Sequence, residues 1–180
     1  MGGSLFHHSI IFLYLSLIHI FFVLGRAAAV ALPAGVVIWL MANLTLGDRS
    51  LLMHCAGFLD PFARLMGLDG VILLAFFLGL PANEIVVPII LMAYLSQGSL
   101  TQMTDYASLH ALLTANGWTW VTALCTMLFS LMHWPCSTTL MTIRKETQSL
   151  RWTAAAAWIP TGCGVLLCML VNAVAALFGF

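Results

Sequence analysis

Residues 71–95, VILLAFFLGLPANEIVVPIILMAYL, decide the fold of this chain, because they form an apolar run of membrane length with a single interruption. The interruption is Leu80-Pro81-Ala82-Asn83-Glu84, and it separates flanks of 10 and 11 residues, Val71–Leu80 and Ile85–Leu95. Each flank extends roughly 15 Å as a helix, which is half of a ~30 Å hydrocarbon core. The stretch therefore predicts either a re-entrant hairpin or a broken span.

A second apolar run breaks in the same way further along the chain. The run from Val121 to His133 is interrupted by Trp134-Pro135-Cys136, and a polar half-helix follows that carries Ser137, Thr138, Thr139 and Thr142. In both breaks we expect proline at the first position of a new half-helix, where its missing N–H costs nothing. An ionisable side chain then lies in or near the first turn, Glu84 in one break and Cys136 in the other.

Both breaks have the chemistry of a cation path. Helix breaks in hydrocarbon are tolerated where they are buried in protein or line a polar cavity. The N-terminus of a half-helix favours a carboxylate or a thiolate. Proline also frees carbonyl oxygens, here those of Phe77, Leu131 and, through Pro88, Glu84. A thiolate, an imidazole and a carboxylate together favour a transition metal over sodium or calcium. The candidate metal ligands are Cys136, Glu84, Asn83 and His133, and the candidate pore-lining residues are Ser137, Thr138, Thr139 and Thr142.

Each candidate also has a purely structural interpretation. A free cysteine is often a buried packing residue, His133 fits a hydrogen-bonded packing histidine, and Asn83 fits a cap on the broken backbone. Serine and threonine hydroxyls in membrane helices often bond their own helix. The case for function is strongest at Glu84, the only formal charge between Asp69 and Asp105, because a carboxylate at membrane depth costs several kcal/mol.

The composition of the whole chain agrees with a membrane protein. Of its 180 residues 62% are apolar and 7% are charged, and the formal net charge is zero. Ordinary soluble domains have roughly 25% charged residues, and a short soluble chain cannot bury so large an apolar fraction. A soluble globular domain, a disordered tail and a nucleic-acid-binding protein, which needs a basic patch, are therefore excluded. The length allows about four to six spans.

Cysteine and glycine patterns exclude several kinds of site. The five cysteines form no C-x-x-C pair and no zinc-ligand spacing, so neither a disulfide framework nor a zinc site is indicated. No G-x-x-x-x-G-K-[ST] loop is present, so this chain alone has no recognisable site for nucleotide phosphates. Nucleotide binding would therefore require another domain.

The remaining segments complete an all-α, polytopic architecture with broken or re-entrant helices. Ser9–Gly25 is a marginal first span, Ala27–Leu46 is long enough to cross, and Trp152–Phe178 is the last span. Ser50–Gly67 has helical amphipathic spacing typical of a pair of helices lying at the interface. In that pair, Asp60 is expected to cap a second helix that begins at Pro61.

Short polar residues predict where some helices begin and end, and charge predicts the orientation. Gly67 ends the amphipathic segment, while Asp105 caps a short helix that ends at Asn116-Gly117. The only basic cluster is Arg144, Lys145 and Arg151, so this loop is expected to be cytoplasmic. With that orientation, the positive-inside rule favours the re-entrant hairpin for residues 71–95.

Four segments resemble a known family. They are VLGRAAAVALPAGVVIWLMAN, GFLDPFARLMGLDGVILLAFFLGLPANEIVVPIILMAYL, NGWTWVTALCTMLFSLMHWPCSTTLMTIRKETQSLRWT and IPTGCGVLLC. Together they cover about Val23 to Val171 and resemble the C-terminal membrane region of ferrous iron transport protein B (the FeoB family). Residues 1–22 are atypical of that family, so the Gate-type transmembrane domain is expected at residues 23–180.

The resemblance implies a multi-pass Fe²⁺ importer of a bacterial or archaeal inner membrane. The membrane part of that family contains two Gate repeats, and this chain resembles the second repeat and the final spans. The family's cysteine motif corresponds to Cys136, and its P-A-N-E acid corresponds to Glu84, with Asn83 beside it. The partners implied are lipid, Fe²⁺ in transit, the first Gate repeat and an N-terminal GTP-binding domain. GTP would act only through that domain, and no permanently bound cofactor is expected.

The chain is therefore expected to be a fragment of a longer permease. If the first Gate repeat does not line the pore, two paired copies of this chain could line it. Three other functions are the alternatives to iron transport. The first alternative function is a Gate-domain relative that transports nucleosides, for which the two breaks offer few aromatic and hydrogen-bonding groups. The second is a membrane assembly fragment that transports nothing. An enzyme that uses Cys136 and His133 as a thiolate pair lacks a third orienting group, so we do not expect an enzyme.

Overall fold

The computed structural model describes residues 21, 24–25, 28–96 and 105–179. The elements are a helix at Ala28–Asn43, the strands β1 (Thr45–Leu46) and β2 (Arg49–Ser50), the helices α2 (Leu51–Leu65) and α3 (Gly70–Leu78), a 3-10 turn η1 (Asn83–Ile85), and the helices α4 (Val86–Tyr94), α5 (Tyr106–Ala115), α6 (Trp120–Met132), α7 (Ser137–Thr147) and α8 (Leu150–Leu177). Among these residues the only sheet is the two-stranded hairpin of β1 and β2. The all-α prediction is confirmed. The predicted first span, Ser9–Gly25, lies almost entirely outside the described residues.

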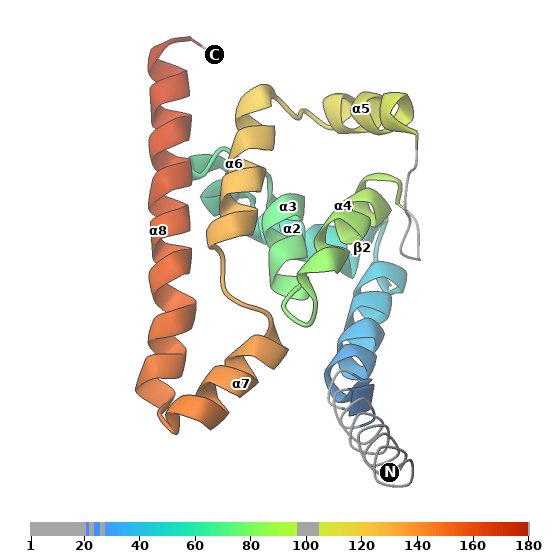
Figure 1. Cartoon of the computed structure of the whole chain (residues 1–180). Helices are drawn as coiled ribbons and strands as arrows, with labels where there is room; N and C mark the ends of the chain where they lie inside the picture. Colours follow the sequence, from blue (N-terminus) through green and yellow to red (C-terminus); the bar gives the residue numbers. More distant parts are fainter. Residues whose placement is uncertain (1–20, 22–23, 26–27, 97–104, 180) are drawn as a thin grey trace, which may run out of the picture.

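The apolar hairpin of α3 and α4 forms the centre of the molecule. The chain reverses direction between these two helices (Figure 1), and every residue of α3 from Gly70 to Phe76 is buried. Most of α4 is also buried. A helix that is apolar on all sides must be covered on all sides, and here the cover comes mainly from α2 and α4, with Phe129 of α6 packed against Phe76. Residues 71–95 thus form a helical hairpin, as the first of the two predicted alternatives requires, and most of it is buried inside the protein.

The open end of this hairpin is tied to Trp118, two residues before helix α6. The Asp69 carboxylate accepts from the Ile72 N–H at 2.7 Å and so caps α3. Its other oxygen accepts from the Tyr94 hydroxyl, which in turn accepts from Trp118 Nε1 at 2.8 Å. Three segments that are distant in sequence are therefore joined at this end. The first break lies at the other, closed end of the hairpin, where the second break can reach it.

The amphipathic segment is one helix, so the prediction that Pro61 begins a second helix is wrong. Pro61 lies inside α2, and Asp60 does not cap it. Instead, the Asp60 carboxylate accepts from Arg64 Nε at 2.6 Å and from the Gly70 N–H at 3.0 Å. Local sequence rules assign the Asp60 side chain to a helix cap, but it makes a long-range hydrogen bond to α3 instead. Gly67 ends the segment as predicted, with φ +71°.

Helices α6 and α8 pack closely through small side chains. The Cys125 thiol donates to the Cys168 carbonyl oxygen at 3.8 Å, and the Cys168 thiol donates to the Cys125 carbonyl oxygen at 3.4 Å. Gly164 lies so near α6 that an added Cβ would lie 2.8 Å from the Cβ of Met132. These cysteines are packing residues, as their place in apolar runs indicates.

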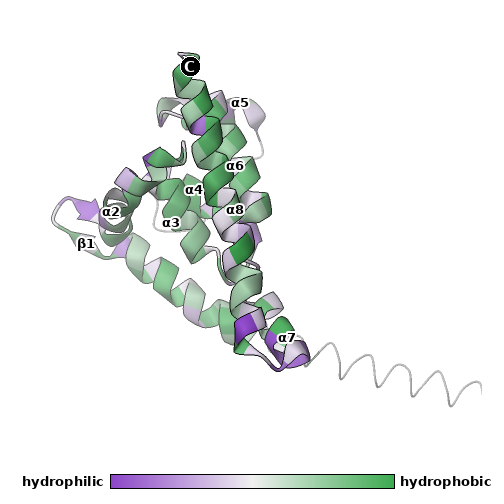
Figure 2. Ribbon diagram, turned by 90° about the vertical axis from the view of Figure 1, so that its left-hand side faces the viewer, coloured by the Kyte–Doolittle hydropathy of each residue, from purple (hydrophilic) through white to green (hydrophobic). Residues whose placement is uncertain are grey.

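Because the breaks shorten the helices, the described residues contain fewer possible spans than the roughly four to six predicted. In the described part of the chain, α8 alone is long and apolar enough to cross a bilayer unbroken. The count reaches three if each of two bent helix pairs is one span: α2 with α3, bent by 108°, and α5 with Trp120–Thr147, bent by 105°. Figure 2 shows apolar colour along most helices, with hydrophilic residues at the β1 end and at the corner of α7 and α8.

Helix α5 begins at Asp105 as predicted. The Asp105 carboxylate accepts from the Ser108 hydroxyl, and from the Ser108 N–H at 2.9 Å. These bonds hold the pKa of Asp105 below its ordinary value, because they favour the charged form. A lowered pKa means that the cap stabilises α5 above the ordinary value, and that this stabilisation disappears as the pH falls through the lowered value.

We therefore expect Asp105→Ala to speed amide hydrogen exchange in α5 at pH 7. The effect should vanish at a pH below the lowered pKa, where the wild-type carboxyl is also neutral. Asp105→Ser is the matched control, because its hydroxyl caps a helix without titrating. A difference between Ala and wild type that persists unchanged at low pH would contradict the assignment.

Candidate functional site

The first break is a tight turn that begins at Gly79. A Cβ on Gly79 would lie 2.5 Å from Val86 Cγ2 and 3.0 Å from the Ala75 carbonyl oxygen, so only glycine lets the two arms of the hairpin approach this closely. Pro81 lies in the turn, two residues before the 3-10 turn η1. The prediction that Pro81 is the first residue of a half-helix is therefore wrong, because the reversal needs extra residues between the arms.

The polar residues of this turn face outward. Glu84 is in the first turn of η1, as predicted, and both Glu84 and Asn83 are exposed. The Phe77 carbonyl oxygen, which was expected to be free, accepts from the Leu80 N–H at 3.4 Å. The turn thus offers a carboxylate and a carboxamide at its tip, while the backbone behind them is partly satisfied.

The second break turns the chain through four extended or irregular residues. Helix α6 ends at Met132, His133 is its extended C-cap, and Cys136 is the N-cap of α7. Pro135 therefore precedes the cap and does not begin the helix, which corrects the prediction. Cys136 Sγ lies 3.1 Å from Thr138 Oγ1 and 3.1 Å from Thr139 Oγ1. The sulfur is held at the N-terminus of α7, where the helix dipole favours a thiolate.

The two breaks meet directly. The Ser137 N–H, at the start of α7, donates to the Leu80 carbonyl oxygen at 2.9 Å, and Leu80 immediately precedes the proline of the first break. The rings of Phe77 and Trp134 stack beside this bond, with centroids 4.8 Å apart. We call this meeting point the junction. Neither the hydrogen bond nor the aromatic contact could be read from local sequence patterns.

His133 is buried at the junction with a defined tautomer. Its side chain is 6% exposed. Nδ1 lies 2.9 Å from the Ser130 carbonyl oxygen and 3.1 Å from that of Phe129. Since carbonyl oxygens only accept, Nδ1 carries the hydrogen, and Nε2 of the neutral ring has a lone pair. Phe76 lies against the ring with centroids 5.0 Å apart.

Three buried polar atoms at the junction have no hydrogen-bond partner among the residues that the structure describes: His133 Nε2, Trp134 Nε1 and Ser137 Oγ. An unpaired buried polar group typically costs about 1–3 kcal/mol, so a bound ion or water that pairs with any of these three atoms would stabilise the junction. His133 and Ser137 were candidates from the sequence. Trp134 was missed as a polar group, although a tryptophan beside a membrane break always has an N–H to satisfy.

The other predicted pore-lining residues divide into two kinds. Thr138 and Thr139 contact the Cys136 sulfur, as described above. The Thr142 hydroxyl donates to the Thr138 carbonyl oxygen at 3.0 Å, so it bonds its own helix, which is the structural interpretation. Among the described residues, no group of three or more His, Cys, Asp or Glu side chains is placed to hold a metal ion. A metal at the junction would therefore need carbonyl or hydroxyl oxygens beside the side chains of His133 or Cys136.

A groove of about 240 Å³ opens beside the junction. We call it the aromatic groove, and its lining residues are Phe77, Leu80, Trp134, Leu140, Ala157, Trp158 and Thr161. The one hydroxyl among them, on Thr161, donates to the Ala157 carbonyl oxygen at 2.7 Å. The groove thus offers aromatic surface and almost no unused polar group.

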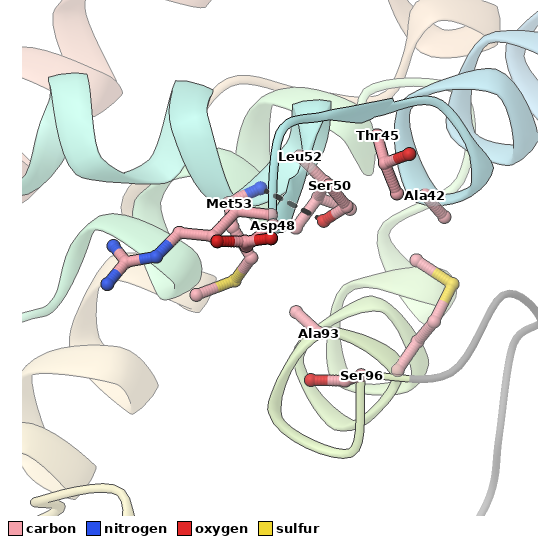
Figure 3. Close-up of a pocket in the computed structure, with 10 residues that line it drawn as sticks. Ala42, Thr45, Asp48, Ser50, Leu52, Met53, Ala93 and Ser96 are labelled. Carbon is pink, nitrogen blue, oxygen red and sulfur yellow. Dashed lines mark hydrogen bonds between the residues drawn. The ribbon is translucent and has the colours of Figure 1, made fainter.

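Two larger cavities lie away from the candidate ligands. Figure 3 shows the first, about 550 Å³, where Asp48 and Ser50 of the strand hairpin face Ala93 and Ser96 at the end of α4. Within it, the Ser50 hydroxyl caps α2 by accepting from the Met53 N–H at 3.4 Å. The second, about 380 Å³, lies at the corner of α2 and α3 beside Asn172. Neither cavity is lined by a predicted metal ligand.

The comparisons with known proteins give one match. The family model described as "Gate: Nucleoside recognition" matches residues 24–150, which is more than two thirds of the chain and includes both breaks. No curated protein and no solved structure matches the chain.

Proposed function

Since the chain belongs to the Gate family, whose domains are of a membrane-transporter type, we propose that it forms part of a permeation path for ferrous iron in a bacterial inner membrane. The junction is the section of that path described here. Residues beyond it, from a first Gate repeat or a second copy of the chain, would complete the lining. A separate GTP-binding domain would control its opening.

The observation that carries this proposal is the buried lone pair of His133 Nε2 at the meeting point of the two breaks. A histidine whose Nδ1–H is held by backbone carbonyl oxygens has the arrangement found in metal-binding imidazoles. The Cys136 sulfur lies three residues away in the same break. Imidazole nitrogen and thiolate sulfur suit iron and its neighbours in the first transition series better than sodium or calcium.

The exposed turn of the first break supplies oxygen ligands in place of the nitrogen and sulfur of the junction. Glu84 and Asn83 are exposed at the tip of the hairpin and suit a cation that still keeps part of its water shell. Transport requires weak binding at several places, so that the ion can leave each of them. The described part of the chain has no preformed three-ligand cluster, and transient sites of this kind do not require one. The proposed order is from the carboxylate at the tip to the softer donors of the junction, or the reverse.

A nucleoside is the second candidate cargo, and the aromatic side chains around the junction favour it. The description of the matched family also names nucleosides. The extent of opening is the argument against it: each unpaired polar atom at the junction is sealed from solvent, so any solute reaches these atoms only when the junction opens, and a nucleobase needs a wider opening than a cation. The aromatic groove is large enough for a base, but its one hydroxyl, on Thr161, is used by its own helix. A small cation therefore fits the described geometry better.

Solute uptake by proteoliposomes that contain the full chain tests the proposal. We expect uptake of radiolabelled Fe²⁺ under reducing conditions, and we expect Cys136→Ser and Glu84→Gln each to lower the rate about tenfold or more. Cys163→Ser is the matched control, because Cys163 is exposed on α8 and lies in neither break. Uptake of labelled uridine instead of iron would establish the nucleoside alternative. Failure to move either solute, together with co-purification of a partner helix protein, would favour an assembly role.

A further inference from the structure

The aromatic groove has no part in the proposed transport, and it lies close to the main basic cluster of the chain. The groove is formed by the end of α3, the second break, α7 and α8. Trp158, on its α8 side, is 73% exposed, so the groove faces outward. In a membrane, lipid tails surround such a surface.

The basic cluster lies at the corner where α7 turns into α8. Arg144 and Lys145 are in the last turns of α7, and Arg151 is in the first turn of α8. The left-handed residue Gln148, with φ +52°, makes the turn between them. All three cationic side chains are exposed. The single ion pair in the described part of the chain joins Asp60 and Arg64, so the nearby Glu146 forms no ion pair with any of the three.

On α7, Arg144 lies above the groove at about the spacing found within a lipid, while Lys145 and Arg151 project from other faces of their helices at the same corner. Leu140 lines the groove and is four residues before Arg144, so both lie on one face of α7, about 6 Å apart along the axis. Ala157 follows Arg151 by six residues, or about 9 Å along α8. A phospholipid places its phosphate and the start of its acyl chains at a comparable separation, since the headgroup layer is roughly 6 Å thick.

We propose that the groove and the basic corner together bind one anionic phospholipid. One acyl chain lies against Phe77, Trp134 and Trp158, and the phosphate group lies among Arg144, Lys145 and Arg151. Each cationic side chain near an anionic headgroup contributes about a fivefold gain in affinity. This inference does not depend on the identity of the transported solute, because the groove contains neither His133 nor Cys136.

Native mass spectrometry of the purified full chain in detergent, with phosphatidylglycerol or phosphatidylcholine added at equal concentration, tests this proposal. We expect the chain to retain one phosphatidylglycerol and to bind phosphatidylcholine far more weakly. The double variant R144Q/K145Q should lower the affinity for phosphatidylglycerol about twenty-five-fold, the product of two fivefold effects. Arg49→Gln, which removes one exposed charge on β2, is the control and should have no effect.

A variant of the groove separates a true site from simple charge attraction. Ala157→Trp fills the groove without changing any charge, and it should abolish retention of phosphatidylglycerol. If its helical content by circular dichroism is not that of the wild type, Leu140→Gln, on the half-exposed face of α7, serves in its place. Equal affinity for the two lipids, or retention that survives the groove variant, would overturn the proposal. So would a dimer that dissociates in Ala157→Trp, since a second copy would then occupy the groove.

Discussion

Replacing His133 by asparagine is expected to weaken Fe²⁺ binding by the purified chain tenfold or more, although the fold should remain intact. The asparagine amide nitrogen takes the place of Nδ1 and can still donate to the Ser130 carbonyl oxygen, 2.9 Å away in the wild type. The lone pair of Nε2 is lost, and with it the ligand that the junction presents. Even losing an outer-shell partner of a metal ligand typically costs 10–100-fold in affinity.

His133→Gln is the matched variant for this experiment. Its amide oxygen can occupy the position of Nε2, whereas the donor to the Ser130 carbonyl oxygen is lost. Both variants remove the ring that packs against Phe76, so both should lower the melting temperature similarly. Anaerobic titration with Fe²⁺ should therefore rank wild type first, glutamine second and asparagine last. Equal affinity of all three proteins would show that His133 Nε2 binds no metal.

The second large effect is expected from Gly70→Ala at the corner of α2 and α3. A Cβ on Gly70 would lie 2.0 Å from the Ala56 carbonyl oxygen, 2.8 Å from the Ala56 carbonyl carbon and 2.9 Å from the Asp60 nitrogen. All three atoms are backbone, so no side-chain rotation relieves the clash. The Gly70 N–H also donates to the Asp60 carboxylate at 3.0 Å. Separating the helices should cost about 3 kcal/mol or more, at the upper end of overpacking effects.

Thermal unfolding of the purified protein in detergent measures this cost, and Gly57→Ala is the control. Gly57 also lies in α2, but a Cβ there would meet nothing within 4 Å. Alanine is the better helix former by about 1 kcal/mol, so this variant should unfold at the same temperature as the wild type or slightly above it. If the two alanine variants unfold at the same temperature, the close contact of α2 and α3 is wrong.

Local rules predicted the features of this chain that depend on a few neighbouring residues. Apolar run length and proline placed the two breaks, and Asp105 and Gly67 were recognised as helix boundaries because capping and left-handed turns involve adjacent residues. Asp60 shows where such rules fail. It has the sequence of a cap before proline, yet its carboxylate reaches Gly70 on the next helix, and tertiary packing decides its role.

The candidate site was predictable in its residue types but not in its arrangement. His133, Cys136 and Glu84 were identified because ionisable groups in membrane runs are unusual. The tautomer of His133 depends on where α6 ends, and the bond from Ser137 to Leu80 joins segments more than fifty residues apart. Proline was expected to begin each half-helix, but it lies before the 3-10 turn in one break and before the cap in the other. The preference of proline for the first position of a helix does not account for the extra residues that a sharp change of chain direction requires.

The bond between Ser137 and Leu80 also couples the two broken segments mechanically. Helix α7 has 11 residues and is therefore about 16 Å long. A tilt of roughly 5° about its far end would shift its first residue by about 1.4 Å, enough to stretch a 2.9 Å contact past hydrogen-bonding range. The helix thus acts as a lever arm. A small rotation of α7 about its charged end would either move the hairpin tip or break the hydrogen bond that joins the two segments.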